Sequence, residues 1–227
     1  MTPGNNSGDS STVWVRIWDA PTRWFHWAVA ALVATSWFTG SQAYMKAHLW
    51  SGLTLLALLI FRLVWGVIGS TTARFSDFLH PPTRVLGYFR ALLSHDKPAY
   101  AGHNPAGGWM VLTLMAFLLA QVTTGLFSND GIRFMGPLAL RVSADTSDRL
   151  SELHRLLFNG ILCLVWLHLV AVFFYLLVKG ENLIRPMVTG YKHRAHVPSN
   201  LTLNFIHAAV AVLVMAAAAG LVMFFLT

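Results

Sequence analysis

Five long apolar segments limit the folds that this chain of 227 residues can adopt. They cover about residues 24–40, 48–68, 108–127, 153–178 and 201–226. A helix needs about 20 apolar residues to cross the hydrocarbon core of a bilayer, and stretches rich in Gly and Pro separate the segments. The sequence therefore predicts an all-α integral membrane protein with five transmembrane helices.

The composition agrees with a surface that faces lipid. Hydrophobic residues make up 56% of the chain and charged residues only 11%, against about 25% charged in an average soluble domain. The net charge of +7 is spread between the apolar segments, so we expect no nucleic-acid partner. Cys163 is the only cysteine, which excludes an intramolecular disulfide and a CxxCH site for covalent haem. Any haem must be held by ligation and packing alone.

The basic residues predict the orientation of the chain. With five spans, eleven of the sixteen Lys and Arg residues fall on the side of the N-terminus. The positive-inside rule then places the N-terminus in the cytoplasm and the C-terminus in the periplasm of a bacterial inner membrane. Residues 1–13 show no signal-peptide pattern and are expected to be a disordered tail. Residues 83–94 are expected to form a short amphipathic helix, on the membrane surface or packed on the bundle.

Four histidines lie in or at the ends of the predicted spans, and an ionisable side chain there needs a partner inside the protein. Because successive spans run in opposite directions, His26 and His168 lie at cytoplasmic depth, whereas His48 and His154 lie at periplasmic depth. The cross-pairings would have to reach across the bilayer. The depths therefore predict two pairs, His26 with His168 and His48 with His154.

The fourteen-residue step from His154 to His168 is almost four helical turns, about 21 Å along the axis. One helix can thus supply a ligand to each of two stacked sites. Neutral imidazole is the usual axial ligand of a non-covalent haem, and bundles build cofactor sites between facing helices. Hydrogen bonds between helices would explain any single histidine, but the depth-sorted set of four favours ligation of haem iron.

Other residues near these sites leave alternatives open. Gly52 and Gly160 either give clearance to a flat macrocycle or allow close helix packing. Arg23 and Arg62, at the cytoplasmic ends of their helices, either pair with haem propionates or only determine the topology. The remaining histidines are not expected to be ligands: His80, His95, His103, His193, His196 and His207.

The segments RIWDAPTRWFHW (residues 16–27) and LHRLLFNGILCLVWLH (residues 153–168), with His48 between them, resemble the bacterial cytochrome b561 family. That family includes the b-type cytochrome subunits of nickel–iron hydrogenases. The resemblance covers roughly residues 14–185. It implies a four-helix haem-binding bundle with two haems b, ligated by the same two histidine pairs, that exchanges electrons with the quinone pool.

This resemblance divides the chain into a dihaem domain at 14–190 and, at 191–227, a linker with an additional helix that the family does not explain. Ala216 and Gly220 on that helix suit docking against a partner subunit or a second copy, or packing on its own core.

The leading hypothesis is a respiratory-chain cytochrome b that links quinone to a hydrogenase-like enzyme or a cytochrome c. One alternative is a stand-alone quinone-linked oxidoreductase that acts on a small species such as superoxide. Another is a haem-free transporter whose histidines bind metal or relay protons.

Overall fold

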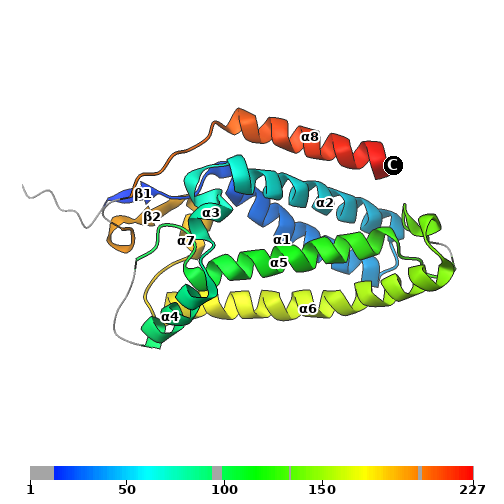
Figure 1. Cartoon of the computed structure of the whole chain (residues 1–227), viewed down its shortest axis with the longest axis horizontal. Coiled ribbons are helices and arrows are strands. Elements are labelled where there is room, and N and C mark those ends of the chain that lie inside the picture. Colours follow the sequence, from blue (N-terminus) through cyan, green and yellow to red (C-terminus); the bar gives the residue numbers. More distant parts are fainter. Residues whose placement is uncertain (1–12, 94–98, 133, 199–200, 227) are drawn as a thin grey trace, which may run out of the picture.

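Five long helices run side by side along the length of the molecule (Figure 1). The structure is a computed structural model that describes residues 13–93, 99–132, 134–198 and 201–226; most of the expected tail, and His95, lie outside these ranges. The long helices are α1 (Ala20–Ser41), α2 (Met45–Ile68), α5 (Pro105–Leu126), α6 (Ala144–Leu177) and α8 (Ala208–Leu226). The first four form a bundle, and α8 lies outside it against α2 (Figure 1).

Four of the described helices, α2, α5, α6 and α8, are long and apolar enough to cross a membrane. The fifth, α1, is also 22 residues long but is interrupted by polar side chains such as Thr35 and Ser36, so its expected role as the first span stays a prediction. Large apolar side chains on the outside of the bundle, for example Trp166 and Phe224 at 68% and 81% exposure, form a surface that suits lipid. The chain is an all-α, multi-pass membrane protein.

The helix starts follow from local capping chemistry. Asp19 accepts a hydrogen bond from the Thr22 N–H at the start of α1, and Asn104 accepts one from the Gly107 N–H at the start of α5. Both helices have proline in the first turn, where its missing N–H costs nothing. These caps fix where each helix begins and therefore the depth of the residues that follow.

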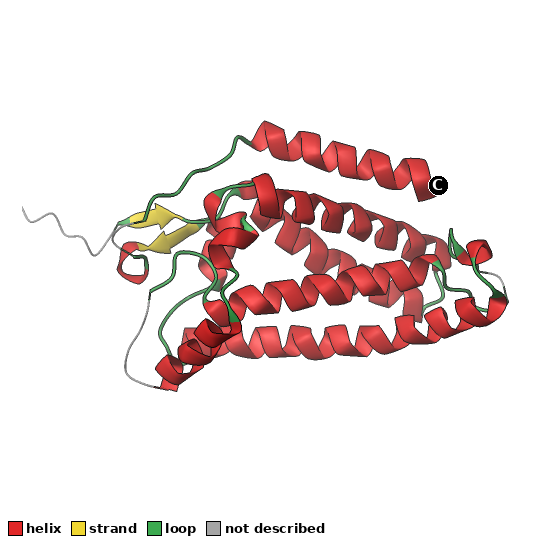
Figure 2. Cartoon of the chain, viewed as in Figure 1, coloured by secondary structure: helices red, strands yellow, loops and turns green. Residues whose placement is uncertain are grey.

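One end of the bundle carries a small cap, which we call the cap end (Figure 2). It comprises β1 (Trp14–Arg16), β2 (Tyr191–His193), α3 (Phe75–Phe78), α4 (Pro82–Leu93), α7 (Ile184–Thr189) and the 3-10 turns Thr71–Ala73 and Arg194–His196. The two strands pair antiparallel; at three residues each they were too short to be predicted. The opposite end, the loop end, carries the α1–α2 turn and residues 127–132 and 134–143, which include the 3-10 turn Ala139–Arg141.

A buried ion pair ties the cap together. Lys192 Nζ lies 2.6 Å from Glu181 Oε1 and donates a further hydrogen bond to the Tyr100 carbonyl at 2.8 Å.

The expected amphipathic helix is α4, which contacts α5. Its Tyr88 is buried, whereas Leu86 and Phe89 are exposed. The cap therefore joins the segment before α1 and the segment after α6 to the connection between α2 and α5.

The last helix begins later than expected. The prediction of a helix from residue 201 was wrong, because residues 201–207 form no helix and hydrogen-bond to the residues that follow α2 instead: the Thr71 N–H donates to the Asn204 carbonyl, and the Ile206 N–H to Ser70 Oγ. α8 packs on α2 of its own chain through buried Ala218. A Cβ built at Gly220 would meet nothing within 4 Å, so docking of that outer face on another helix stays a prediction.

Candidate functional site

The structure brings together the histidines whose predicted depths match. The ring centres of His26 and His168 are 6.3 Å apart, and those of His48 and His154 are 6.1 Å apart. Two imidazoles that bind one metal ion through bonds of about 2 Å have ring centres roughly 6 Å apart. Each pair therefore fits one metal ion between its rings.

The helices explain why the pairs lie at opposite ends of the bundle. α6 is continuous through both His154 and His168, so its fourteen-residue step puts them on one face. α1 and α2 form an antiparallel hairpin through Ala43, which has a left-handed φ of 57°. Each of these helices carries its histidine near its own start, and the starts lie at opposite ends. We call His26 with His168 the cap-side pair and His48 with His154 the loop-side pair.

Backbone carbonyls orient both rings of the loop-side pair. His48 Nδ1 lies 2.8 Å from the Ser36 carbonyl, and His154 Nδ1 lies 2.8 Å from the Gln121 carbonyl. A carbonyl only accepts, so each Nδ1 carries the proton and each Nε2 keeps its lone pair, the form in which histidine binds a metal. The Gln121 side-chain nitrogen lies 3.2 Å from His154 Nε2, so this amide must turn aside for a metal bond to form.

Two glycines that the sequence did not single out make room for these rings. A Cβ at Gly40 would lie 3.1 Å from His48 Nδ1, and a Cβ at Gly125 would lie 2.9 Å from His154 Cε1. Any side chain at Gly125 would therefore displace the imidazole. Both glycines belong to neighbouring helices, and a single sequence does not show which residues meet across helices.

Gly52 and Gly160, the two glycines that the sequence singled out, differ in the space around them. A Cβ at Gly52 would meet nothing within 4 Å, so Gly52 is not needed for close helix packing, and its role in giving clearance to a macrocycle stays a prediction. A Cβ at Gly160 would lie 2.5 Å from Phe117 Cε1. That contact favours the close packing of α5 against α6, which the sequence had left as the alternative for Gly160.

The cap-side pair lies among polar atoms that lack partners. Seven buried side-chain nitrogen or oxygen atoms of the described residues have no hydrogen-bond partner, and six of them lie at this end, including Arg23 Nε, His26 Nδ1, Arg62 Nη1 and His103 Nδ1. Arg23 does donate through Nη1 to the Val188 carbonyl. Buried polar groups are normally paired, so this cluster is suited to hold a polar group that the chain itself does not supply.

His103 was expected to be a loop residue without a role. Its ring centre instead lies 4.8 Å from that of Trp18 and 4.7 Å from that of Phe78. Burial, and to a smaller extent the positive charge of Arg62, lowers the pKa of His103 to about 3. His103 is therefore neutral at physiological pH, with one N–H donor and one acceptor nitrogen.

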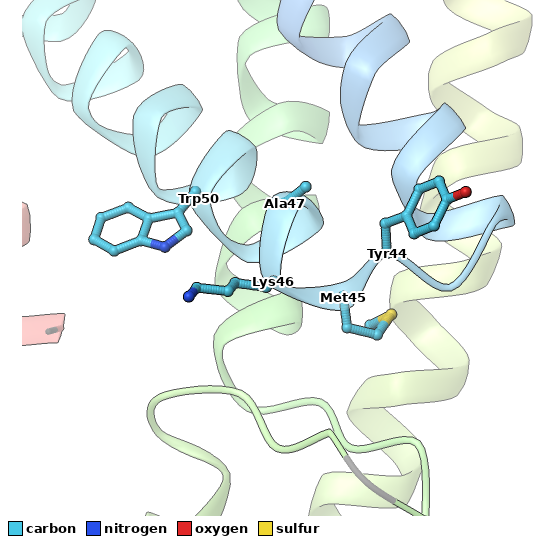
Figure 3. Close-up of a pocket in the computed structure, with 5 residues that line it drawn as sticks. All are labelled: Tyr44, Met45, Lys46, Ala47 and Trp50. Carbon is cyan, nitrogen blue, oxygen red and sulfur yellow. The ribbon is translucent and has the colours of Figure 1, made fainter.

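A shallow apolar groove lies at the loop end, at the start of α2 (Figure 3). It is lined by Tyr44, Met45, Lys46, Ala47 and Trp50. The Lys46 and Trp50 side chains extend to one side of the helix, whereas Tyr44 lies on the other side, at the turn (Figure 3). The groove is a surface depression and includes none of the four histidines.

The fold and the site define a class: a helical multi-pass membrane protein with a pair of facing histidines at each end of one bundle. The sequence pattern of the prokaryotic cytochrome b561 family matches residues 17–190, and the chain belongs to this family. It is therefore a membrane b-type cytochrome that acts in electron transfer. The matched region ends before α8. No curated protein and no solved structure matches the chain.

Proposed function

We propose that the chain binds two b-type haems, one between the histidines of each pair, and conducts electrons across the bacterial inner membrane. The observation that carries this proposal is the separation of about 6 Å between the ring centres in both pairs. A haem held at each pair supplies a one-electron carrier. Membership of a haem-binding family argues against the haem-free transporter that the sequence left open.

The residues of the loop-side pair have distinct roles in this proposal. His48 and His154 are the axial ligands, and the carbonyls of Ser36 and Gln121 hold the ring protons on Nδ1. Gly52 leaves clearance for the macrocycle. The rise of α6 between its two histidines, about 21 Å, sets the spacing of the two sites along the bundle axis.

We also propose the orientation of the protein in the membrane and its electron partners. The excess of basic residues on the N-terminal side places the cap end in the cytoplasm. A membrane quinone is the proposed electron partner on one side of the reaction, and a hydrogenase-like subunit or a cytochrome c is the partner on the other. Arg23 and Arg62 both lie at the cap end and are the candidates for propionate binding.

Proteoliposomes with ferricyanide trapped inside test the function. External dithionite tests conduction alone, and external duroquinol tests the quinone as donor. We expect internal ferricyanide to be reduced with either donor by the wild-type protein, and His154→Ala and His168→Ala each to reduce the rate to background. His207→Ala is the matched control, because His207 is exposed and accepts only the Ala209 N–H in the described structure. Full rates in either site variant would refute conduction through the two pairs.

A further inference from the structure

Arg62 has no acceptor for its buried charge. The side chain is 2% exposed, and Nη1 has no hydrogen-bond partner among the described residues. Its guanidinium lies 4.9 Å from the centre of the Phe75 ring and 5.9 Å from that of Phe78. Aromatic rings stabilise a cation but do not take up its N–H donors in the way that a carboxylate does. A buried guanidinium without a hydrogen-bonded anion is costly, so an anionic ligand is expected here.

Asp19 is the nearby carboxylate, but its hydrogen bonds are used elsewhere. Oδ1 accepts from the Thr22 N–H at 2.8 Å, and Oδ2 accepts from Trp65 Nε1 at 3.0 Å. No ion pair joins Asp19 to Arg62 in the part of the chain that the structure describes. Asp19 therefore stabilises the charge of Arg62 electrostatically but accepts no hydrogen bond from its guanidinium.

The position of Arg62 on α2 matches the depth of the cap-side pair. Arg62 follows His48 by fourteen residues, the same step that separates His154 from His168 on α6. His48 and His154 face each other, and both helices run from the loop end to the cap end (Figure 1). The equal steps therefore bring Arg62 to the level of His168, on the face of α2 that carries His48.

His103 borders the same space from another segment. Phe78 lies beside both His103 and Arg62, and His103 Nδ1 is buried without a partner. The shared contact with Phe78 therefore places His103 near Arg62. Two segments thus bring unpaired polar atoms to the cap end, where one histidine pair lies.

We infer that Arg62 and His103 together bind a carboxylate, and that this carboxylate is a propionate of the haem at the cap-side pair. The inference rests on the proposed function. It adds His103 to the site beside Arg62. Arg23 donates through Nη1 to the Val188 carbonyl and has only Nε left unpaired. Charge-assisted hydrogen bonds from a guanidinium to a carboxylate are among the strongest that a protein forms.

The test is the rate at which each haem leaves the full-length holoprotein for excess apomyoglobin in detergent. A hydrogen bond to a charged group contributes enough to predict that Arg62→Met speeds loss of the cap-side haem about 10-fold or more, with the loop-side haem unchanged. Arg62→Lys keeps the charge, so its rate of cap-side haem loss should lie between those of the wild type and Arg62→Met. His103→Phe should increase this rate less than Arg62→Met does. Arg74→Met is the matched control at the cap end, because the Arg74 guanidinium already pairs with Asp77, and it should change the rate little. Equal acceleration of both haems, no acceleration, or an equal effect of Arg74→Met would overturn the inference.

Haem dimethyl ester separates a carboxylate contact from a purely structural role of Arg62. The full-length wild-type and Arg62→Met chains are reconstituted with haem b or with the ester, which has no free carboxylates. If Arg62 binds a propionate, the substitution accelerates loss of haem b but not of the ester. If it accelerates both by the same factor, Arg62 acts through Asp19 and the inference is wrong. A wild-type protein without haem at the cap-side pair would instead show that the proposed function itself has failed.

Discussion

The two ends of the bundle prepare their histidines in different ways. At the loop end, backbone carbonyls hold His48 and His154, and Gly40 and Gly125 leave room for the rings. At the cap end, His26 Nδ1 has no partner. The loop-side pair is therefore organised by the chain alone, whereas the cap-side pair is surrounded by charged and polar groups whose partners the cofactor would supply.

This difference indicates how the two sites respond to change. Haem binding at the preorganised loop-side pair depends on the open space beside the rings, so a bulky substitution there should remove the haem while the fold persists. Haem binding at the cap-side pair depends on the balance of nearby charges, so the loss of one charge should weaken both haem binding and the stability of the fold. The predictions below use this contrast, from the largest expected effect to the smallest.

Leucine at Gly52 tests the steric dependence of the loop-side pair. A Cβ at Gly52 and one at Gly220 both enter open space, so both substitutions should fold. Gly52 lies one turn from His48 on the inner face of α2, whereas Gly220 lies on the outer surface of α8. We expect Gly52→Leu to lose the loop-side haem almost completely and Gly220→Leu to keep both, measured by haem content and reduced spectra. Two bound haems in Gly52→Leu would show that the open space is not a haem site.

Loss of the Asp19 charge tests the cap end. Asp19→Ala removes the α1 cap, the acceptor for Trp65 and the carboxylate that acts on Arg62. We expect it to reduce the free energy of unfolding by about 3 kcal/mol and to loosen the cap-side haem first. Asp145→Ala is the control, because its ion pair with Arg149 is exposed and should contribute less than about 1 kcal/mol. Equal destabilisation by both variants in thermal unfolding would contradict the contrast.

Removal of α8 should affect neither pair. The helix packs against the outer face of α2 and supplies none of the proposed ligands. A chain that ends after Pro198 should keep both haems with nearly unchanged midpoint potentials, and we expect only a modest fall in thermal stability, because lipid can replace the apolar contacts of α8. Haem content and a redox titration decide the matter; loss of one haem from a chain that still inserts would make α8 part of the electron-transfer unit.

The smallest expected difference concerns the angle between the two axial rings. The ring planes are 88° apart in the loop-side pair and 53° apart in the cap-side pair. Nearly perpendicular axial imidazoles leave two iron d orbitals almost equal in energy, which raises the largest g value of a low-spin ferric haem. We expect the loop-side haem to show the higher value in electron paramagnetic resonance, and His154→Ala to remove that signal. The reverse assignment would mean that haem binding reorients the rings.

The sequence predicted the histidine pairs because depth depends only on the order of the spans and the rise of a helix. It also predicted that α8 lies outside the four-helix core. It did not predict Gly125, Gln121 or the Ser36 carbonyl as neighbours of the loop-side rings, because these are contacts across helices whose rotation no local pattern fixes.

The cap was the least predictable part. His103, just before α5, is held at the cap end by ring contacts with Trp18 and Phe78. Residues 201–207 are apolar enough to suggest a helix, yet their backbone hydrogen bonds go to the residues that follow α2. In both places, partners distant in the sequence decide the structure.

The number of haems per chain tests the central claim most directly. A pyridine haemochrome assay, combined with protein quantification, should give two haems b in the wild-type protein and one in each of His154→Ala and His168→Ala. The two variants should lose different components of the reduced spectrum, since each removes a ligand from a different pair. One haem in the wild-type protein, or loss of the same component in both variants, would contradict the assignment of one haem to each histidine pair.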